Sequence, residues 1–277
     1  GNYFLQGIPQ GNSGWIQARP DIITGFAWGP EIPVFTAPGQ PLVGLDLVVK
    51  PGVKVIGYTV NPAQEPIPFQ EFGYSSKLTN GWGMSDGMGY FEFRLPVGQH
   101  WINFDGQKEM YAALPIEVNV SEADLTLPNQ GPVYLVLYSQ STGGAISGTL
   151  STTGVPASGG QFFIVAFPAG TALNPVTIYG LNPTQETDFF GVNGSFELFP
   201  LPPDVNYDVY LGLFRIDGPE SFVALDARSN IPAGTNNLTF LYDTPGITVD
   251  GSVTDGLRNV PGAQVLIMPA PGNANAG

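Results

Sequence analysis

Residues 51–60 read PGVKVIGYTV, and the same pattern returns twice further along the chain. It recurs as GGAISGTL at 143–150 and as PGITVDGSV at 245–253. In every copy one glycine stands five positions before a second glycine, and the second glycines are Gly57, Gly148 and Gly251. They are separated by 91 and then 103 residues. Ordered recurrence at this spacing predicts a tandem array of similar units.

The glycine pattern belongs to a longer repeat. An apolar segment precedes each copy, and an apolar residue followed by proline comes after it. A later element, GYFEF at 89–93, matches GSFEL at 194–198, and a turn containing proline follows both. The repeated glycines predict bulges or bends at which a side chain would not fit. The apolar segments are 45–49, 133–138 and 238–242, and the apolar–proline pairs are 67–68, 155–156 and 260–261.

The periodicity within each unit is that of β-strands. Residues 90–95 alternate apolar and polar side chains, which places Phe91, Phe93 and Leu95 on one face and the charged residues on the other. The runs 133–138 and 162–167 are continuously apolar and too short for helices, so we expect central strands buried on both faces. The only helical signal is a cap-like turn at 121–124.

Composition supports a folded, turn-rich chain. Of the 277 residues, 43% are hydrophobic and only 12% are charged, while there are 37 glycines and 27 prolines. Enough apolar side chains are present to build a core, so disorder is excluded. Short strands separated by glycine and proline are typical of sandwiches. The predicted fold is all-β, with tandem Greek-key or prealbumin-like β-sandwich domains and almost no helix.

Charge and cysteine content exclude several partners and cofactors. Nine Lys and Arg against 23 Asp and Glu give a net charge of −14, which leaves no basic stripe for nucleic acid or for an anionic membrane surface. No apolar run is long enough to cross a bilayer, so we expect no membrane insertion. The chain has no cysteine, which removes disulfides, metal–thiolate centres and thiol nucleophiles.

The repeated motifs resemble a known family. A glycine-bearing first strand, an apolar–proline pair, and G-x-F-x-F followed by L-P-x-G and an aromatic strand are similar to the carboxypeptidase-regulatory-like and Cna-B-like domains. These are prealbumin-type, Ig-like sandwiches of bacterial and archaeal surface proteins. The best matching stretches are 249–265 and 86–98, and the resemblance covers roughly 52–277. It implies a β-sandwich that serves as a spacer, stalk, pilin-like subunit or accessory module, located outside the cell or on its surface.

The repeat predicts the domain boundaries. Residues 52–142 and 143–245 are each expected to form a complete sandwich, because units of this length can bury a core of their own. Residues 1–51 lack the glycine opening and resemble the closing strands of an incomplete unit. Residues 246–277 hold only the opening strands of a further unit. In the first fragment the strand-like segments are 22–26, 32–35 and 45–49.

A half-sandwich exposes unpaired strand edges and half a core. We therefore expect the C-terminal fragment to be completed by the N-terminal fragment of another copy, in a head-to-tail filament formed by donor-strand complementation. The alternative is that neighbouring repeats of one longer chain complete it. In both cases the partners are copies of the same unit.

Candidate chemical residues are few. The single histidine, His100, lies at a turn-to-strand junction and is expected to be a surface residue, and no serine has a nucleophile motif around it. We therefore expect no catalytic residue and no cofactor. A structural calcium ion is the one metal considered, because acidic side chains in turns are the ligands it prefers. The candidate ligands are Asp243, Asp250, Asp255 and Asp86.

The resemblance also implies an intramolecular isopeptide bond in many Cna-B-like domains. Lys54 lies in the matching early strand, but there is no lysine between Lys108 and the C-terminus, so the second repeat cannot form one. We do not expect it in the first repeat either. Three sequons provide glycosylation candidates at Asn119, Asn193 and Asn237. Trp15, Trp28, Trp82 and Trp101 are either core aromatics or platforms for sugar rings.

The leading prediction is a non-enzymatic structural subunit or segment of an extracellular filament, stalk or surface layer. The alternative is a glycan-binding adhesin or an accessory module of a secreted enzyme, with glycans as partners. A catalytic glycosidase is the third hypothesis, since it needs a pair of carboxylates. Glu92 and Glu197 occupy equivalent, outward-facing positions in the repeat, which indicates a shared solvated face and not such a pair.

Overall fold

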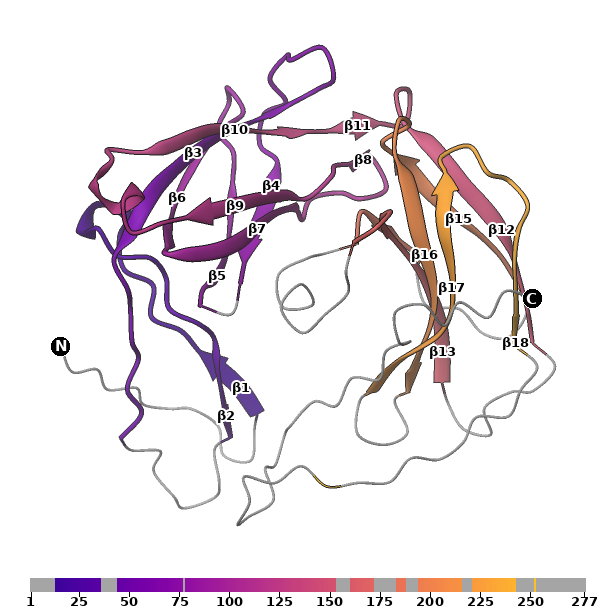
Figure 1. Ribbon diagram of the computed structural model, residues 1–277, viewed down its shortest axis with the longest axis horizontal. Helices are drawn as coiled ribbons and strands as arrows, with labels where there is room; N and C mark the ends of the chain where they lie inside the picture. The colour runs from indigo at the N-terminus through magenta and orange to yellow at the C-terminus, as the bar shows by residue number, and fades with distance from the viewer. Residues whose placement is uncertain are drawn as a thin grey trace. The chain divides into compact units, whose positions relative to one another are not determined.

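The computed structural model describes residues 13–35, 44–76, 78–152, 160–171, 183–187, 194–215, 221–242 and residue 252. In this part of the chain every regular element is a β-strand except two short 3₁₀ helices, so the all-β prediction is confirmed. None of the described helices is long and apolar enough to span a membrane. The described chain divides into two compact units (Figure 1). Of the described residues, the first unit contains those in 13–106 and 115–137, and the second contains those in 107–114, 138–171 and from 183 onward.

The first unit is a sandwich of two sheets. One sheet has the order β10-β3-β6 and the other has the order β5-β4-β7-β9. Their inner faces bury alternate side chains, such as Val55 and Phe93 from one sheet and Phe72 and Ile102 from the other. The strands are β3 (Gly52–Val60), β4 (Glu71–Ser75), β5 (Asn80–Met84), β6 (Tyr90–Pro96), β7 (Gly98–Phe104), β9 (Ile116–Val120) and β10 (Gln130–Val136).

The second unit repeats this architecture. Its sheets have the orders β18-β12-β15 and β14-β13-β16-β17, which match those of the first unit strand for strand. In both units the closing strand, β10 or β18, pairs in parallel with the opening strand, β3 or β12. The predicted tandem sandwiches are therefore present. The strands are β12 (Gly144–Thr152), β13 (Gly160–Pro168), β14 (Gln185–Glu186), β15 (Gly194–Leu201), β16 (Asn206–Arg215), β17 (Ser221–Pro232) and β18 (Leu238–Tyr242).

The repeated glycines allow close packing between strands. Gly57 lies opposite Phe91, and Gly148 lies opposite Phe196. A Cβ atom on Gly57 would overlap the Phe91 ring and lie 2.7 Å from Val133 Cγ2. A Cβ atom on Gly148 would overlap the Leu238 carbonyl oxygen. The prediction that a side chain would not fit is confirmed for Gly57 and Gly148, whereas the predicted bulge is absent from their pairing with β6 and β15, which keeps its register at both residues.

The prediction for 133–138 is wrong, because this run is not a central strand buried on both faces. Among the described strands β10 pairs only with β3 and is an edge strand, so its side chains alternate. Leu135 is fully buried, whereas Tyr134 is 47% exposed and stacks on Tyr58 with ring centroids 6.0 Å apart. The run 162–167 does lie in a central strand, β13, but only Phe162, Ile164 and Ala166 face the core.

The N-terminal segment contains less strand than predicted. β2 (Ile32–Phe35) pairs with β1 (Ser13–Ile16) in an antiparallel hairpin, so the prediction for 32–35 is confirmed. The prediction for 22–26 is wrong: Ile22–Thr24 forms the 3₁₀ helix η1, because the Asp21 carboxylate accepts the N–H of Ile23 and Gly25 adopts a φ of 83°. Residues 45–49 also form no strand.

Three short elements complete the description. The strands β8 (Tyr111–Ala112) and β11 (Tyr138–Ser139) pair antiparallel within the second unit. The 3₁₀ helix η2 spans Asp124–Thr126. The Asp124 carboxylate accepts hydrogen bonds from the N–H and the hydroxyl of Ser121, which confirms the cap-like turn predicted at 121–124.

Candidate functional site

In the first unit a segment that precedes β3 covers one side of the sandwich. We call residues 17–29 the N-terminal strap. The Gln17 side-chain amide donates hydrogen bonds to the carbonyl oxygen and to Oδ1 of Asn80, at 2.7 and 2.8 Å, which attaches the strap to β5. Arg94 of β6 donates from Nε to the Ile22 carbonyl oxygen. The strap therefore bridges β5 and β6, which are one edge strand of each sheet.

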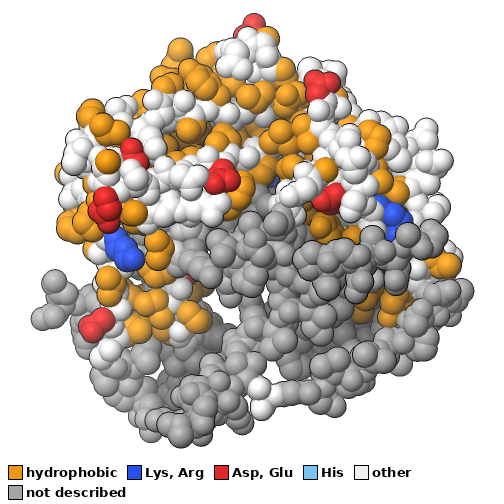
Figure 2. Space-filling model, in the orientation of Figure 1, with side chains coloured by type: hydrophobic (Ala, Val, Ile, Leu, Met, Phe, Trp, Pro, Cys, Tyr) orange, Lys and Arg blue, Asp and Glu red, His pale blue; other side chains and the backbone are white. Residues whose placement is uncertain are grey.

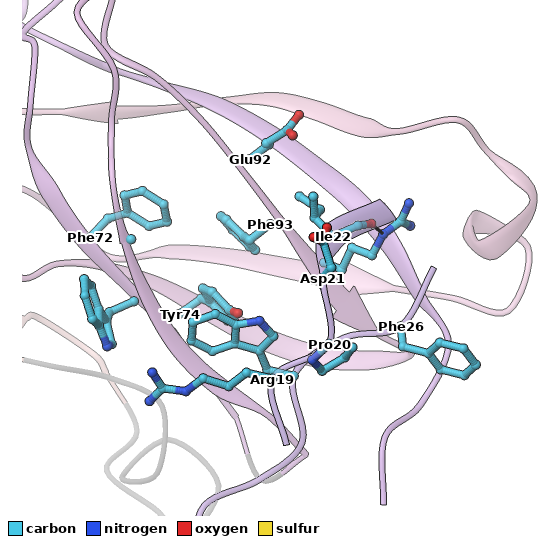
Figure 3. A pocket seen from close by; sticks show the side chains of 13 residues that line it. Arg19, Pro20, Asp21, Ile22, Phe26, Phe72, Tyr74, Glu92 and Phe93 are labelled. Atoms are coloured by element: carbon cyan, nitrogen blue, oxygen red, sulfur yellow. Dashed lines mark hydrogen bonds between the residues drawn. The ribbon is translucent and has the colours of Figure 1, made fainter. Parts of the chain in front are cut away.

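A pocket of about 300 Å³ lies between the strap and these two edges. Figure 3 shows Phe72, Tyr74 and Phe93 side by side, with Arg19 at one end of the group and Glu92 at the other. The Tyr74 and Phe93 rings stack with centroids 4.4 Å apart, and the centroid of the Phe72 ring lies 5.6 Å from that of the Phe93 ring. These three buried rings form an apolar floor. The remaining lining residues are Pro20, Asp21, Ile22, Phe26, Trp28, Trp82, Gly83 and Arg94.

Three of the four tryptophans gather in this region. Trp28 and Trp82 line the pocket. The guanidinium carbon of Arg19 lies 4.6 Å from the centre of the Trp28 ring and 5.3 Å from that of Trp15, within cation–π distance of both. Trp101 lies on β7 and does not line the pocket. The structure thus brings together a basic side chain and aromatic rings from the strap, the β1–β2 hairpin and β5.

The polar groups of the pocket have distinct electrostatic environments. Burial raises the pKa of Tyr74 far above its ordinary value, so its hydroxyl keeps its proton at neutral pH. The Tyr90 hydroxyl donates to Glu92 at 2.7 Å and lowers the pKa of that carboxyl group, and Lys54 at 3.3 Å acts in the same direction. Glu92 is therefore an ionised acceptor at neutral pH. Lys54 thus forms an ion pair with Glu92, and both side chains are about one-third exposed.

The calcium candidates do not form a site in the described residues. Asp86 is exposed, and its Oδ1 accepts the N–H groups of Met88 and Tyr90 at 2.8 and 2.9 Å, so this carboxylate closes the turn before β6. Within the described ranges no group of three or more His, Cys, Asp or Glu side chains could hold a metal ion. Asp243, Asp250 and Asp255 lie outside the described residues.

The glycosylation candidates are placed in part. Asn119 is exposed on β9, and its amide donates to Glu117 Oε1 at 2.8 Å. Asn237 is exposed immediately before β18. Asn193 lies outside the described residues. The positions of Asn119 and Asn237 are compatible with modification, which stays a prediction.

The prediction for His100 is wrong, because this side chain is fully buried. Its Nε2 donates to the Pro96 carbonyl oxygen at 2.7 Å, while Nδ1 has no hydrogen-bond partner among the described residues. Burial lowers the pKa of His100, so the neutral ring is favoured. A comparable contact occurs in the second unit, where Tyr207 lies five residues after Pro202 and its hydroxyl donates to the Pro202 carbonyl oxygen at 2.8 Å, while His100 lies four residues after Pro96.

Charged side chains are sparse on the visible surface. Figure 2 shows acidic and basic groups scattered among apolar and uncharged side chains on one face of the described residues. Two of the exposed or half-exposed basic residues in this part of the chain, Lys54 and Lys108, pair with glutamates. Arg19 instead lies against aromatic rings.

Comparison with known proteins gives distant structural matches only. No family model and no curated protein sequence matches the chain. Among solved structures, the Bacillus anthracis TIE protein matches at 12% identity and a TM-score of 0.27, covering 80% of this chain and 39% of the other. The present chain therefore spans less than half the length of that protein.

Two pilins are similar at the same level. A streptococcal ancillary pilin matches at 14% identity and a TM-score of 0.27, with 83% of this chain and 76% of the other covered. A shaft pilin from Lactobacillus rhamnosus GG matches at 10% identity and a TM-score of 0.26, with 72% and 100% covered. At these scores we build no argument on the matches, and the fold assignment rests on the strand order of the two units.

Proposed function

We propose that the chain is a non-enzymatic structural protein, a subunit or segment of an extracellular filament, stalk or surface layer. The observation that carries this proposal is that one sandwich architecture occurs twice in succession. Both units have the same strand order in both sheets and the same glycine–phenylalanine pair between the first and fourth strands. Successive copies of one sandwich build length with a single type of core, which is the requirement for a spacer or a shaft.

The opening strand of the second repeat starts from a short turn. β11 ends at Ser139 and β12 begins at Gly144, so only residues 140–143 lie between them. Three hydrogen bonds fix this turn: Gly143 N–H and Thr142 N–H donate to the Ser139 carbonyl oxygen at 2.7 and 3.0 Å, and Ser139 N–H donates to Thr142 Oγ1 at 2.9 Å. Because β11 and β12 both belong to the second unit, this turn fixes where the opening strand of that sandwich begins.

The finer part of the proposal is self-association. Residues 246–277 of one copy would be completed by residues 1–51 of the next, in a head-to-tail filament. The N-terminal strap is already attached to β5 and β6 of its own first unit. A second copy would therefore meet this segment as part of a folded surface, with the β1–β2 hairpin as the strand pair at its edge.

Electron microscopy and light scattering of the purified 277-residue protein test the proposal. We expect concentration-dependent assembly into fibres with a regular axial repeat, which dissociate on a denaturing gel to a band near 29.4 kDa. A chain that stays monomeric at all concentrations would contradict self-association. Hydrolysis of a polysaccharide or peptide by the purified protein would contradict the non-enzymatic assignment.

A further inference from the structure

The pocket of the first unit has exposed aromatic rings that the packing of the sandwich does not require. Trp82 is 60% exposed although Phe72 and Tyr74 on the neighbouring strand are buried. Trp15 does not line the pocket, but it is 55% exposed and lies beside the guanidinium group of Arg19, which does. Single exposed apolar side chains are common on protein surfaces, but aromatic rings gathered around a concave pocket are typical of ligand sites.

Two glycines let the aromatic rings of the pocket pack directly against β5. Trp82 lies between Gly81 and Gly83 on β5. A Cβ atom on Gly81 would lie 2.7 Å from Cε3 of Trp28, and a Cβ atom on Gly83 would lie 2.8 Å from Cζ of Phe72. Larger residues at these positions would displace the rings of Phe72, Tyr74 and Trp28. Because Trp82 pairs with Gly73, its indole lies on the exposed face of β5, opposite to the face of Gly81 and Gly83, and it borders the pocket from this edge strand.

Most polar groups of the pocket are already bonded within the protein. Asp21 accepts the N–H of Ile23, and Arg94 donates to the carbonyl groups of Ile22 and Gly52. Arg19 differs, because its hydrogen bond in the described part of the chain uses only Nε, which donates to Gln17 Oε1 at 2.7 Å. Its two Nη groups are the donors available to a ligand at the rim.

We propose that this pocket binds a pyranose residue of a neutral polysaccharide. One face of a pyranose ring carries C–H groups that pack on an indole, while the hydroxyl oxygens at its rim accept hydrogen bonds from a guanidinium group. A volume of about 300 Å³ is small for a ligand pocket and suits one or two sugar residues. The net charge of −14 opposes a polyanionic glycan. This binding site goes beyond the structural role and does not depend on self-association.

Calorimetry and affinity electrophoresis of the full chain test the site. The probes are mannan, soluble β-1,3-glucan, xylan and chitohexaose, with heparin and a decaproline peptide as members of other ligand classes. We expect at least one neutral glycan to bind, and we expect Trp82→Ala to weaken its binding at least tenfold. Arg19→Gln should weaken it by a smaller factor. Circular dichroism checks that both variants fold, which their exposed positions favour.

The matched control is Tyr134→Ala, which removes a ring that is 47% exposed on β10 and does not line the pocket. This variant should bind the glycan like the unmodified protein. Binding of none of the four neutral glycans would overturn the proposal, whether or not heparin or the peptide binds. Binding that Trp82→Ala and Arg19→Gln leave unchanged, or that Tyr134→Ala weakens equally, would also overturn it.

Discussion

In each unit a buried ring donates a hydrogen bond at the corner where the Leu-Pro turn leads into the next strand, but the side chain differs between the units. In the first unit, His100 Nε2 donates to the carbonyl oxygen of Pro96. In the second unit, the hydroxyl of Tyr207 donates to the carbonyl oxygen of Pro202. Both side chains are fully buried near the start of the strand that follows the Leu-Pro turn. Each corner thus contains one buried donor on an aromatic ring, and the chemical identity of that ring differs between the units.

The open side of each sandwich also differs between the units. In the first, the N-terminal strap covers the gap between β5 and β6 and leaves the aromatic pocket. In the second, Gln185 of β14 donates to the carbonyl oxygen of Lys108, and Lys108 pairs with Glu186 at 2.9 Å. A preceding segment is thus attached to the edge strand in both units. The attachment is therefore a repeated structural feature, whereas the aromatic pocket is lined by residues of the first unit alone.

The largest expected effect comes from a substitution at the repeated glycine, which both units share. Gly148→Ala places a Cβ atom on the backbone of β18, which cannot move without separating two paired strands. We expect a loss of about 3 kcal/mol in the free energy of unfolding, at the upper end for overpacking. Gly57→Ala should cost less, because its Cβ atom meets the side chains of Phe91 and Val133, which can adjust.

Denaturant unfolding of both alanine variants measures this difference. The double variant Gly57→Ala, Phe91→Leu is the matched control, because a smaller side chain opposite the glycine should return part of the lost stability relative to Phe91→Leu alone. Equal destabilisation by the two alanine variants would contradict the distinction between a backbone contact and a side-chain contact.

Sequence alone predicted the features that depend on periodicity. The recurring glycines, the opposing phenylalanines and the alternation at 90–95 each impose a local geometry, so the tandem sandwich was predictable. The edge position of 133–136 was not, because an apolar run does not reveal on how many sides a strand is paired. Nor did the local sequence reveal the aromatic pocket, which joins the N-terminal strap to strands that are distant in the sequence. The pattern Gly81-Trp82-Gly83 was its only local signal.

The second prediction concerns acid stability, which should differ between the two corners. Burial lowers the pKa of His100 in the folded protein, so below the unfolded pKa of about 6.5 the unfolded chain binds a proton that the folded chain excludes. The stability contributed by the neutral ring is present above that pKa and is lost as pH falls. The loss approaches about 1.4 kcal/mol per pH unit below pH 6.5, until the folded protein also becomes protonated.

Thermal unfolding of the first unit between pH 7.5 and pH 5 checks this prediction. His100→Tyr places in the first unit the side chain that the second unit uses, and it should abolish the His100-linked part of the acid loss. Tyr207→Phe is the control in the second unit. It removes a hydrogen bond and should cost about 1 kcal/mol independently of pH in this range. An unchanged pH dependence in His100→Tyr would refute the role of the buried ring.

The third prediction compares the two edge attachments. Gln185→Ala removes a buried amide that donates to the Lys108 carbonyl oxygen, so we expect a loss of about 1 kcal/mol and faster amide exchange in residues 107–114. Gln17→Ala should increase exchange in the N-terminal strap by a smaller factor, because that amide is only partly buried. If exchange increases throughout the variant protein and not only in the attached segment, the substitution has destabilised the fold in general.

The smallest expected effect concerns the coupling energies of two lysine–glutamate ion pairs, one in each unit. Lys108–Glu186 joins side chains that are 23% and 48% exposed, and a double-mutant cycle to alanine should give a coupling of about 0.5 kcal/mol or less, which salt removes. Lys54–Glu92 should couple somewhat more strongly, because the Tyr90 hydroxyl also donates to Glu92 and holds its carboxylate in place. Tyr90→Phe should therefore reduce the Lys54–Glu92 coupling and raise the pKa of Glu92, as measured by NMR titration. If Tyr90→Phe leaves both quantities unchanged, the two ion pairs are equivalent and the hydroxyl has no part in positioning Glu92.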